Sequence, residues 1–163
     1  MEDDLCEALS RSCQGCRLQG GCCFEARPPL SRERMEILRR NGVPEEAMEF
    51  EGYWRLRTKS DGYCVLFVGG KCSIHSIKPE TCVAGPFTFD INGGMLQIFL
   101  KREGICPMVV FLKTNPKACD ALLETSVAMI MHLVRGIPAS EMAEILKIDE
   151  PETDLVAEIA LED

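Results

Sequence analysis

The sequence lacks any apolar run long enough to span a membrane. Its longest runs, such as MVVFL at residues 108–112, fall far short of the roughly 20 residues that a spanning helix needs. The opening residues, MEDDLCEALS, are acidic and lack the basic and apolar regions of a signal peptide. We therefore expect a protein with no membrane partner and a cytoplasmic location, where cysteines stay reduced.

Basic residues are also scarce. Lys and Arg number 18 against 26 Asp and Glu, which gives a formal net charge of −8. Because contacts to phosphate need Lys and Arg, this balance argues against nucleic acid as a direct partner. The one basic run, at residues 32–40, alternates with Glu33 and Glu36 and is typical of a solvated helix face.

Motifs of nucleotide and hydrolase chemistry are missing as well. No GxGxxG or P-loop opens a helix, and no motif supports a Ser–His–Asp hydrolase. The only histidines are His75 and His132. His132 lies inside a predicted helix, so we interpret it as a partly buried packing residue. His75 follows Cys72 by three residues and is a candidate metal ligand, although many thiolates compete for that role.

Cysteine, in contrast, is abundant, with ten residues in a chain of 163. The glycine-rich segment CQGCRLQGGCC, residues 13–23, holds four of them. A CxxC pair can bring two sulfurs to one ion within a single turn, and the glycines let the backbone fold tightly around thiolates. A redox CxxC of the thioredoxin type would open a helix after a strand, and no strand precedes this one. In a reducing compartment the pattern favours metal or an iron–sulfur cluster over disulfides.

Eight cysteines between residues 13 and 106 are the candidate metal ligands. They are Cys13, Cys16, Cys22, Cys23, Cys64, Cys72, Cys82 and Cys106. Neighbouring side chains diverge, so the adjacent Cys22 and Cys23 serve different centres, or only one of them is a ligand. How the eight thiolates divide between one centre and two stays open.

Three smaller features refine this ligand set. Cys106 stands directly before Pro107, as does the cysteine that closes ligand runs of the ferredoxin type. Cys6 and Cys119 fall at helical spacing among apolar residues, so we interpret both as packing residues.

The pattern as a whole predicts an α+β fold. We expect one domain over residues 1–163, in which residues 13–106 form a cysteine-cluster metal-binding core and residues 107–163 a helical C-terminal segment. The core would combine a small antiparallel sheet with a cysteine-rich metal loop, flanked by helices.

Strand and turn signals fall in the middle of the chain. The apolar run at 63–68 precedes Gly69-Gly70, which predicts a hairpin turn leading into the KCSIH segment. The runs at 87–91 and 95–100 flank Asn92-Gly93-Gly94, a strong hairpin signal. Strand ends and turns would thus present Cys64, Cys72 and Cys82.

Helices are expected on both sides of this sheet, with ends marked by caps, prolines and glycines. They are predicted at residues 3–12, from an N-cap at Ser31 to Asn41, in a short helix beginning at Pro44, in a turn and short helix at 78–82, and at 116–136, 139–146 and 151–161. The 116–136 helix has a predicted buried stripe of Cys119, Leu122, Leu123, Val127, Ile130 and Val134.

The order and spacing of the cysteines resemble those of the YkgJ-like CxxCxxCC cysteine-cluster family, described as zinc- or iron-chelating domains. CxxC is followed by an adjacent CC, then by C-x7-C-x9-C with Pro79 three residues before its last cysteine, and then by a further cysteine. The resemblance spans residues 13–106 and implies that the same eight cysteines are the ligands.

The chain departs from this family in one segment. The usual C-x-I-Y-x-x-R-P-x-x-C is here CSIHSIKPETC, with His75 where Tyr is usual and Lys78 where Arg is usual. Lysine lacks the bidentate fork of arginine, so a carboxylate held there would be bound differently. The same cluster occurs, with an iron–sulfur cluster, in larger proteins that resemble flagellin lysine methylases. This chain has no recognisable S-adenosylmethionine loop, so we do not expect methylase activity.

Three functions follow from these observations. The first is an iron–sulfur protein that holds a [4Fe–4S] cluster for electron transfer, cluster carriage or binding of a substrate at an open iron. The second is a structural zinc-binding module with four-cysteine sites that serves a protein partner. Zinc knuckles usually come as two CxxC pairs, so the single CxxC favours iron. The third is a metal-dependent modification enzyme, which would need an incompletely ligated metal beside a pocket.

Overall fold

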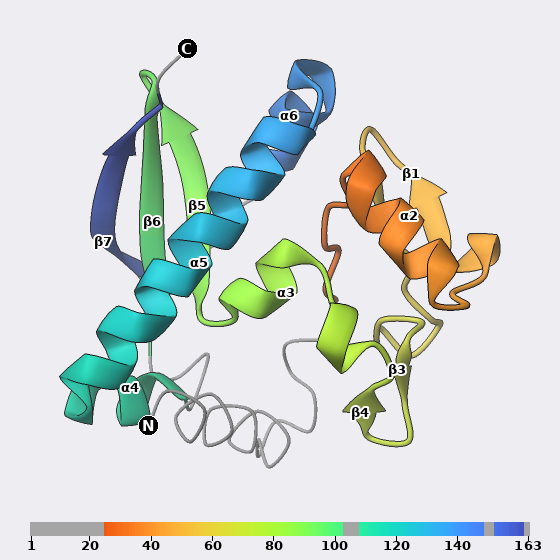
Figure 1. Cartoon of the computed structure of the whole chain (residues 1–163), viewed down its shortest axis with the longest axis horizontal. Helices are drawn as coiled ribbons and strands as arrows, with labels where there is room; N and C mark the ends of the chain where they lie inside the picture. Colours follow the sequence, from red (N-terminus) through yellow and green to blue (C-terminus); the bar gives the residue numbers. More distant parts are fainter. Residues whose placement is uncertain (1–24, 103–107, 149–151, 162–163) are drawn as a thin grey trace.

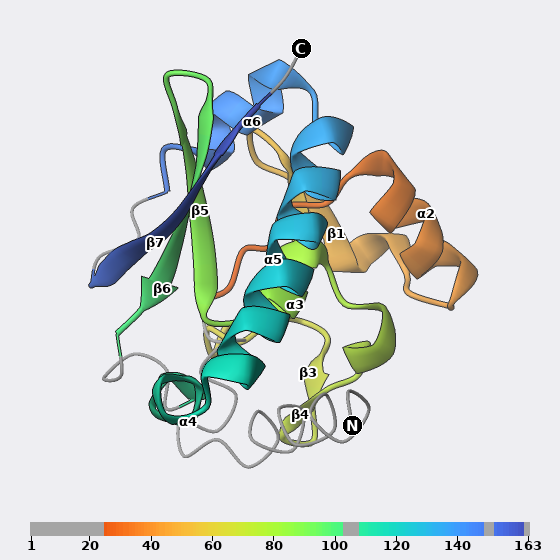
Figure 2. The ribbon, with the colours of Figure 1, turned by 60° about the vertical axis from the view of Figure 1, so that its left-hand side comes forward.

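The computed structural model describes residues 25–102, 108–148 and 152–161. These residues form two parts that lie side by side in both views (Figures 1 and 2). The N-terminal part, residues 25–79, contains one helix and two small hairpins. The C-terminal part comprises the described residues from 80 to 161 and contains a three-stranded sheet with its helices. The predicted helix at 3–12 lies outside the described residues.

Helix α2 (Arg32–Arg40) begins the N-terminal part, as predicted. The Ser31 hydroxyl accepts the Arg34 N–H at 3.1 Å and so caps the helix. The second helix predicted from Pro44 is only the 3₁₀ turn η2 (Glu45–Ala47), because Met48 enters a strand. Strands β1 (Met48–Phe50) and β2 (Trp54–Leu56) form an antiparallel hairpin that the sequence analysis did not predict.

The second hairpin of the N-terminal part is much shorter than expected. Only β3 (Phe67–Val68) and β4 (Lys71–Cys72) pair, across the predicted Gly69-Gly70 turn. The strand predicted at 63–68 is therefore wrong for most of its length. Cys64 instead forms an isolated bridge with Thr58. A turn follows, in which Phe67 N donates to the Cys64 carbonyl at 2.9 Å. The 3₁₀ turn η3 (His75–Ile77) follows β4.

The sheet of the C-terminal part has the strand order β5-β6-β7. The short helix α3 (Glu80–Ala84) leads into the predicted hairpin of β5 (Phe87–Asn92) and β6 (Met95–Lys101). The helix predicted at 151–161 is wrong, because β7 (Thr153–Ala160) pairs antiparallel with β6. Ala157 and Ile159 face the core at the two-residue spacing of a strand.

Helix α5 (Pro116–Gly136) runs across this sheet, with α4 (Met108–Thr114) at one end and α6 (Ala139–Ile145) at the other (Figure 1). Helices α5 and α6 lie where the sequence predicted them, whereas α4 was not predicted. The predicted stripe of α5 packs against the core, but only Ile130 of it is fully buried and the other members are half-buried. The other fully buried residues of the helix, Ala118, Ser126 and Leu133, were not in the predicted stripe. The predicted α+β fold with a helical C-terminal portion is thus confirmed, with its last element changed to a strand.

The two parts meet through side chains of α2 and the β1–β2 hairpin. Tyr53 packs among Leu133, Ile137 and other apolar residues of α5 and α6. The buried Glu141 carboxylate accepts from Arg32 Nη2 at 2.8 Å and from the Trp54 N–H at 3.3 Å. No helix within the described residues is long and apolar enough to cross a membrane.

Candidate metal centre

Three of the eight candidate ligands lie in the described residues. Cys64 lies in the turn before β3, Cys72 ends β4, and Cys82 lies in α3. The other five candidate ligands lie outside the described residues; they are Cys13, Cys16, Cys22, Cys23 and Cys106. The predicted packing residue Cys6 also lies outside them.

Cys64 occupies a buried, amide-lined position. It is only 6% exposed and packs in the hydrophobic cluster that contains Leu30 and Ile74. Burial raises the pKa of its thiol, whereas hydrogen bonding from the backbone N–H groups of Leu66 and Phe67 lowers it. A thiolate at this position would therefore depend on nearby positive charge, which a metal ion supplies.

Cys72 lies close to Cys64. In the β3–β4 ladder Cys72 is the partner of Phe67, the residue whose N–H closes the Cys64 turn. The negative charge of the Cys72 thiolate is one of the causes that raise the pKa of Cys64. The short hairpin thus brings together two thiols that are eight residues apart in the sequence, as ligands of one centre require.

Cys82 lies on a separate element and does not join this pair. It is half-buried in α3, where its N–H donates to the Pro79 carbonyl at 3.0 Å. Within the described ranges, no three His, Cys, Asp or Glu side chains gather closely enough to hold one metal ion. A complete centre therefore needs donors beyond the Cys64–Cys72 pair.

The chain that follows the cysteine-rich segment is fixed next to the Cys64 turn. Glu25, two residues after Cys23 in the sequence, donates its N–H to the Gly62 carbonyl at 2.6 Å. Gly62 in turn precedes Cys64 by two residues. The Tyr53 hydroxyl donates to the Arg27 carbonyl at 3.0 Å. The first bond anchors the exit from the cysteine-rich segment beside Cys64, and the second anchors it to the turn between β1 and β2.

An ion pair near Cys82 was not predicted from the sequence. Arg34 Nη2 donates to Glu80 Oε1 at 3.3 Å, and Arg34 Nη1 donates to the Ile77 carbonyl at 3.2 Å. The Arg34 side chain is 12% exposed and that of Glu80 is 1% exposed. The prediction of a solvated basic run is therefore wrong for Arg34. Its position four residues before the buried Leu38 was the signal that could have revealed this.

Three remaining candidates have different outcomes. Cys119 packs against the core of the C-terminal part, as predicted, and burial followed by the charge of Asp120 raises the pKa of its thiol. His132 is exposed rather than packed, and its Nε2 lies 2.6 Å from Glu33 Oε2 of α2. His75 lies in η3, where burial and then Lys78 lower its pKa and favour the neutral imidazole that binds metals. Its role as a ligand stays a prediction.

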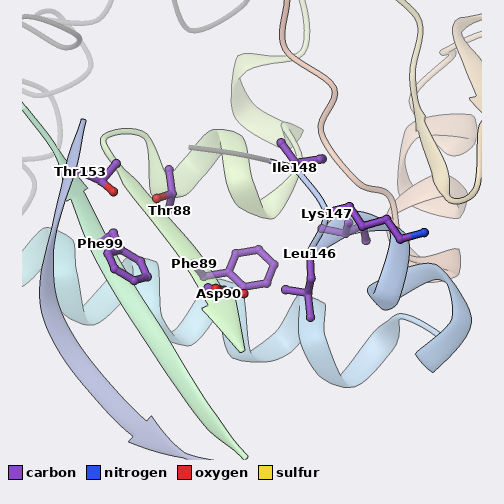
Figure 3. Close-up of a pocket in the computed structure, with 9 residues that line it drawn as sticks. Thr88, Phe89, Asp90, Phe99, Leu146, Lys147, Ile148 and Thr153 are labelled. Atoms are coloured by element: carbon purple, nitrogen blue, oxygen red, sulfur yellow. The ribbon is translucent and has the colours of Figure 1, made fainter. Parts of the chain in front are cut away.

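A hollow of about 440 Å³ lies elsewhere in the molecule, between the sheet and the residues that follow α6 (Figure 3). Thr88, Asp90 and Phe99 line it from the sheet. Lys147 also lines it, but its amino group donates to Glu144 at 2.8 Å and points away from Asp90. No cysteine or histidine is among the described lining residues, so this hollow is separate from the thiols.

Comparison with known proteins agrees with the cysteine pattern. A family model for CxxCxxCC, described as "Putative zinc- or iron-chelating domain", matches residues 12–120. That range is more than half of the chain and includes all eight candidate ligands. No curated protein and no solved structure matches the chain. The chain belongs to the CxxCxxCC family of zinc- or iron-chelating domains.

Proposed function

We propose that this protein holds an iron–sulfur cluster, of the [4Fe–4S] type, through its clustered cysteines. The observation that carries the proposal is the Glu25–Gly62 hydrogen bond at 2.6 Å. It holds the chain that leaves the CxxC and CC segment beside the turn that carries Cys64. Membership of the chelating family supports metal binding in general.

The surroundings of Cys64 suit a cluster ligand. Hydrogen bonds to sulfur, low solvent exposure and thiolate ligation are the means by which proteins stabilise clusters and set their potentials. Backbone N–H groups of Leu66 and Phe67 favour the Cys64 thiolate, and Leu30 and Ile74 pack in the same apolar cluster. Cys64 and Cys72 would supply two thiolates, and the other candidate ligands, which are the cysteines of the cysteine-rich segment, Cys82 and Cys106, would supply the rest.

A bound cluster would supply one-electron chemistry, and an iron with an open position would bind a substrate. The chain's own residues would bind the cluster, exclude water from the Cys64 side and offer amide donors to sulfur. Electron transfer, cluster carriage and open-site chemistry are the three uses consistent with such a site. A reducing compartment, which we take to be the cytoplasm, would preserve the thiolates.

Structural zinc is the second candidate, and the size of the β3–β4 hairpin favours it. Strands of two residues cannot hold a hairpin together by their backbone bonds alone. A closed four-thiolate zinc site would stabilise such a segment directly, and the protein would then act by binding a protein partner. The single CxxC is the feature that keeps iron first.

We also infer that the chain is a single domain over residues 1–163. The inference rests on contacts between the two described parts. Tyr53 inserts among α5 and α6, and Arg32 pairs with Glu141 across the boundary at 2.8 Å. Such contacts bury apolar surface and a charge between the two parts, as the interior of one domain does.

The test is iron, zinc and acid-labile sulfide analysis, with a visible spectrum, on protein purified without oxygen. We expect a brown protein with iron and sulfide in similar amounts. Cys64→Ser should lose most of both, whereas the matched variant Cys119→Ser should keep both. A colourless protein that contains zinc alone would contradict the cluster and support the structural zinc site. Equal metal loss in both variants would overturn the assignment of Cys64 as a ligand.

A further inference from the structure

The pair formed by Arg34 and Glu80 connects the two parts of the molecule at the boundary before Cys82. Arg34 lies in α2, and Glu80 is the first residue of α3. The Arg34 guanidinium contacts the Ile77 carbonyl with one nitrogen and the Glu80 carboxylate with another, at 3.2 and 3.3 Å. One side chain therefore holds both ends of the turn formed by Lys78 and Pro79.

This turn determines how α3 presents Cys82. Helix α3 has five residues, too few for a helix to be stable without tertiary contacts. Successive residues of a helix are turned by about 100°, so Cys82 projects from the side of α3 roughly opposite Glu80. Holding Glu80 against α2 therefore fixes the rotation of α3 about its axis, and with it the direction of the Cys82 side chain.

The far end of α3 is held by a different contact. The buried Ser126 hydroxyl of α5 donates to the Ala84 carbonyl at 3.4 Å, and Ala84 is fully buried in the core of the C-terminal part. Helix α3 is thus held at its last residue by α5 and at its first residue by Arg34. Loss of the Arg34 contact would leave the first residue of α3, two residues before Cys82, without its partner from α2.

The ion pair is poorly suited to a purely stabilising role. Arg34 Nε and Glu80 Oε2 are buried and have no hydrogen-bond partner among the described residues. Removing charges from water costs more than an incompletely bonded pair returns, and apolar residues of similar volume often stabilise such a site better. Geometric specificity is the role that such a pair can fill, because the arginine fork fixes direction.

We propose that Arg34 and Glu80 are positioning residues for Cys82, which they orient as a ligand of the thiolate centre. The inference rests on the proposed metal-binding function and adds two residues to it. Lys78 stands in the turn as a lysine, which cannot make a two-nitrogen contact of this kind. The guanidinium at this turn comes instead from α2, 46 residues before Glu80.

The structure provides a matched control pair. Arg32 of α2 donates to Glu141, a buried carboxylate in the first turn of α6, just as Arg34 donates to Glu80 in α3. Both carboxylates are buried, and both are held by an arginine of the same helix. No candidate ligand lies in α6. Arg34→Lys and Arg32→Lys thus make the same chemical change in the two pairs.

The experiment loads the full chain with Co²⁺ as the probe, because sulfur-to-cobalt charge-transfer absorption reports the number of thiolates bound per ion. Cobalt release to a chelator and alkylation of Cys82, followed by mass spectrometry, are measured on the same samples. Wild-type protein should bind Co²⁺ with strong charge-transfer absorption. Arg34→Lys and Glu80→Gln should show weaker absorption per cobalt, release about 10-fold faster or more, and faster alkylation of Cys82. Arg32→Lys and Glu141→Gln should match wild type in all three.

Each result decides one claim. Equal absorption, release and alkylation in Arg34→Lys and Arg32→Lys would overturn the positioning role while leaving the proposed function intact. A wild-type chain that binds neither Co²⁺, Zn²⁺ nor iron would overturn the proposed function itself, and the positioning role with it. Thermal unfolding of the metal-free variants separates loss of fold from loss of the ligand. If Arg34→Lys unfolds at the temperature of wild type, a change in Cys82 alkylation reports its orientation alone.

Discussion

The two parts of this molecule are held together in different ways. The C-terminal part has strands of six, seven and eight residues and a helix of 21 residues, packed around one large apolar cluster. The N-terminal part has strands of two or three residues, packed on a smaller cluster around Leu30, Leu38 and Leu56. The C-terminal part has long backbone ladders of its own. The N-terminal part, which carries Cys64 and Cys72, has only short ladders and would gain most from a bound metal.

Removal of the metal should have the largest effect, and it should destabilise the N-terminal part much more than the C-terminal part. Structural metal sites contribute on the order of 10 kcal/mol to folding in small domains. After stripping with a chelator, we expect backbone amides of residues 54–72 to lose most of their protection from hydrogen exchange. Amides of β5 and β6 should keep theirs. Uniform loss of protection in both parts would contradict the comparison.

A cavity in the core of the C-terminal part should lower the stability of the fold without changing its metal content. Ile98 is fully buried on β6, so Ile98→Ala removes apolar contacts and leaves a void. We expect a loss of about 2–5 kcal/mol in the free energy of unfolding, measured with urea. Metal content per folded chain should stay at the wild-type value. Metal loss from folded Ile98→Ala protein would show that the core of the C-terminal part also shapes the centre.

Tyr53 tests the hydrogen bond that holds the chain leaving the cysteine-rich segment within the N-terminal part. Tyr53→Phe removes the hydrogen bond to the Arg27 carbonyl and should cost about 1 kcal/mol. Burial raises the pKa of Tyr53 above its usual value near 10. A raised folded-state pKa means that this stability is fully present below about pH 10 and is lost as the pH rises through the raised value.

The pH dependence supplies the control for this anchor. Tyr53→Phe has no phenol to ionise, so the difference in unfolding free energy between it and wild type should narrow as the pH rises above about 10. Urea unfolding between pH 8 and pH 11 would measure it. A constant difference over this range would show that Tyr53 does not ionise with a raised pKa.

Cys119→Ser should give the smallest effect. The thiol is half-buried against the C-terminal core, and burial raises its pKa, so it is a small apolar group with little thiolate at neutral pH. We expect a loss of at most about 1 kcal/mol and slow modification by a thiol reagent at neutral pH. Rapid modification of Cys119 in the folded protein would contradict its assignment as a packing residue.

Sequence signals predicted the locally determined elements well. Ser31 marks the start of α2, Pro116 and Gly136 bound α5, and Gly93-Gly94 turn the β5–β6 hairpin because their positive φ angles of 58° and 76° favour glycine. Strand β7 was missed because Leu155 and Ile159 also fit a helical spacing. Its pairing with β6 is a contact between distant segments that local spacing does not reveal.

In the candidate site, too, local features were predictable and contacts between distant residues were not. The order of the cysteines revealed the family, and the glycine turn after Val68 predicted the hairpin that brings Cys72 near Cys64. The contact between Arg34 and Glu80 was not predictable, because 46 residues separate the partners and both belong to types that usually face solvent. The fold supplies this contact by placing α2 against the start of α3.

The most direct test of the account is X-ray absorption at the edge of the metal with which the protein is isolated. We predict a first coordination shell of sulfur, with iron neighbours if the centre is a cluster, or sulfur at about 2.3 Å around an isolated zinc. Cys64→Ser should lower the metal content or the number of sulfur neighbours. A first shell made only of oxygen and nitrogen, unchanged in Cys64→Ser, would contradict the claim that the clustered thiolates hold the metal.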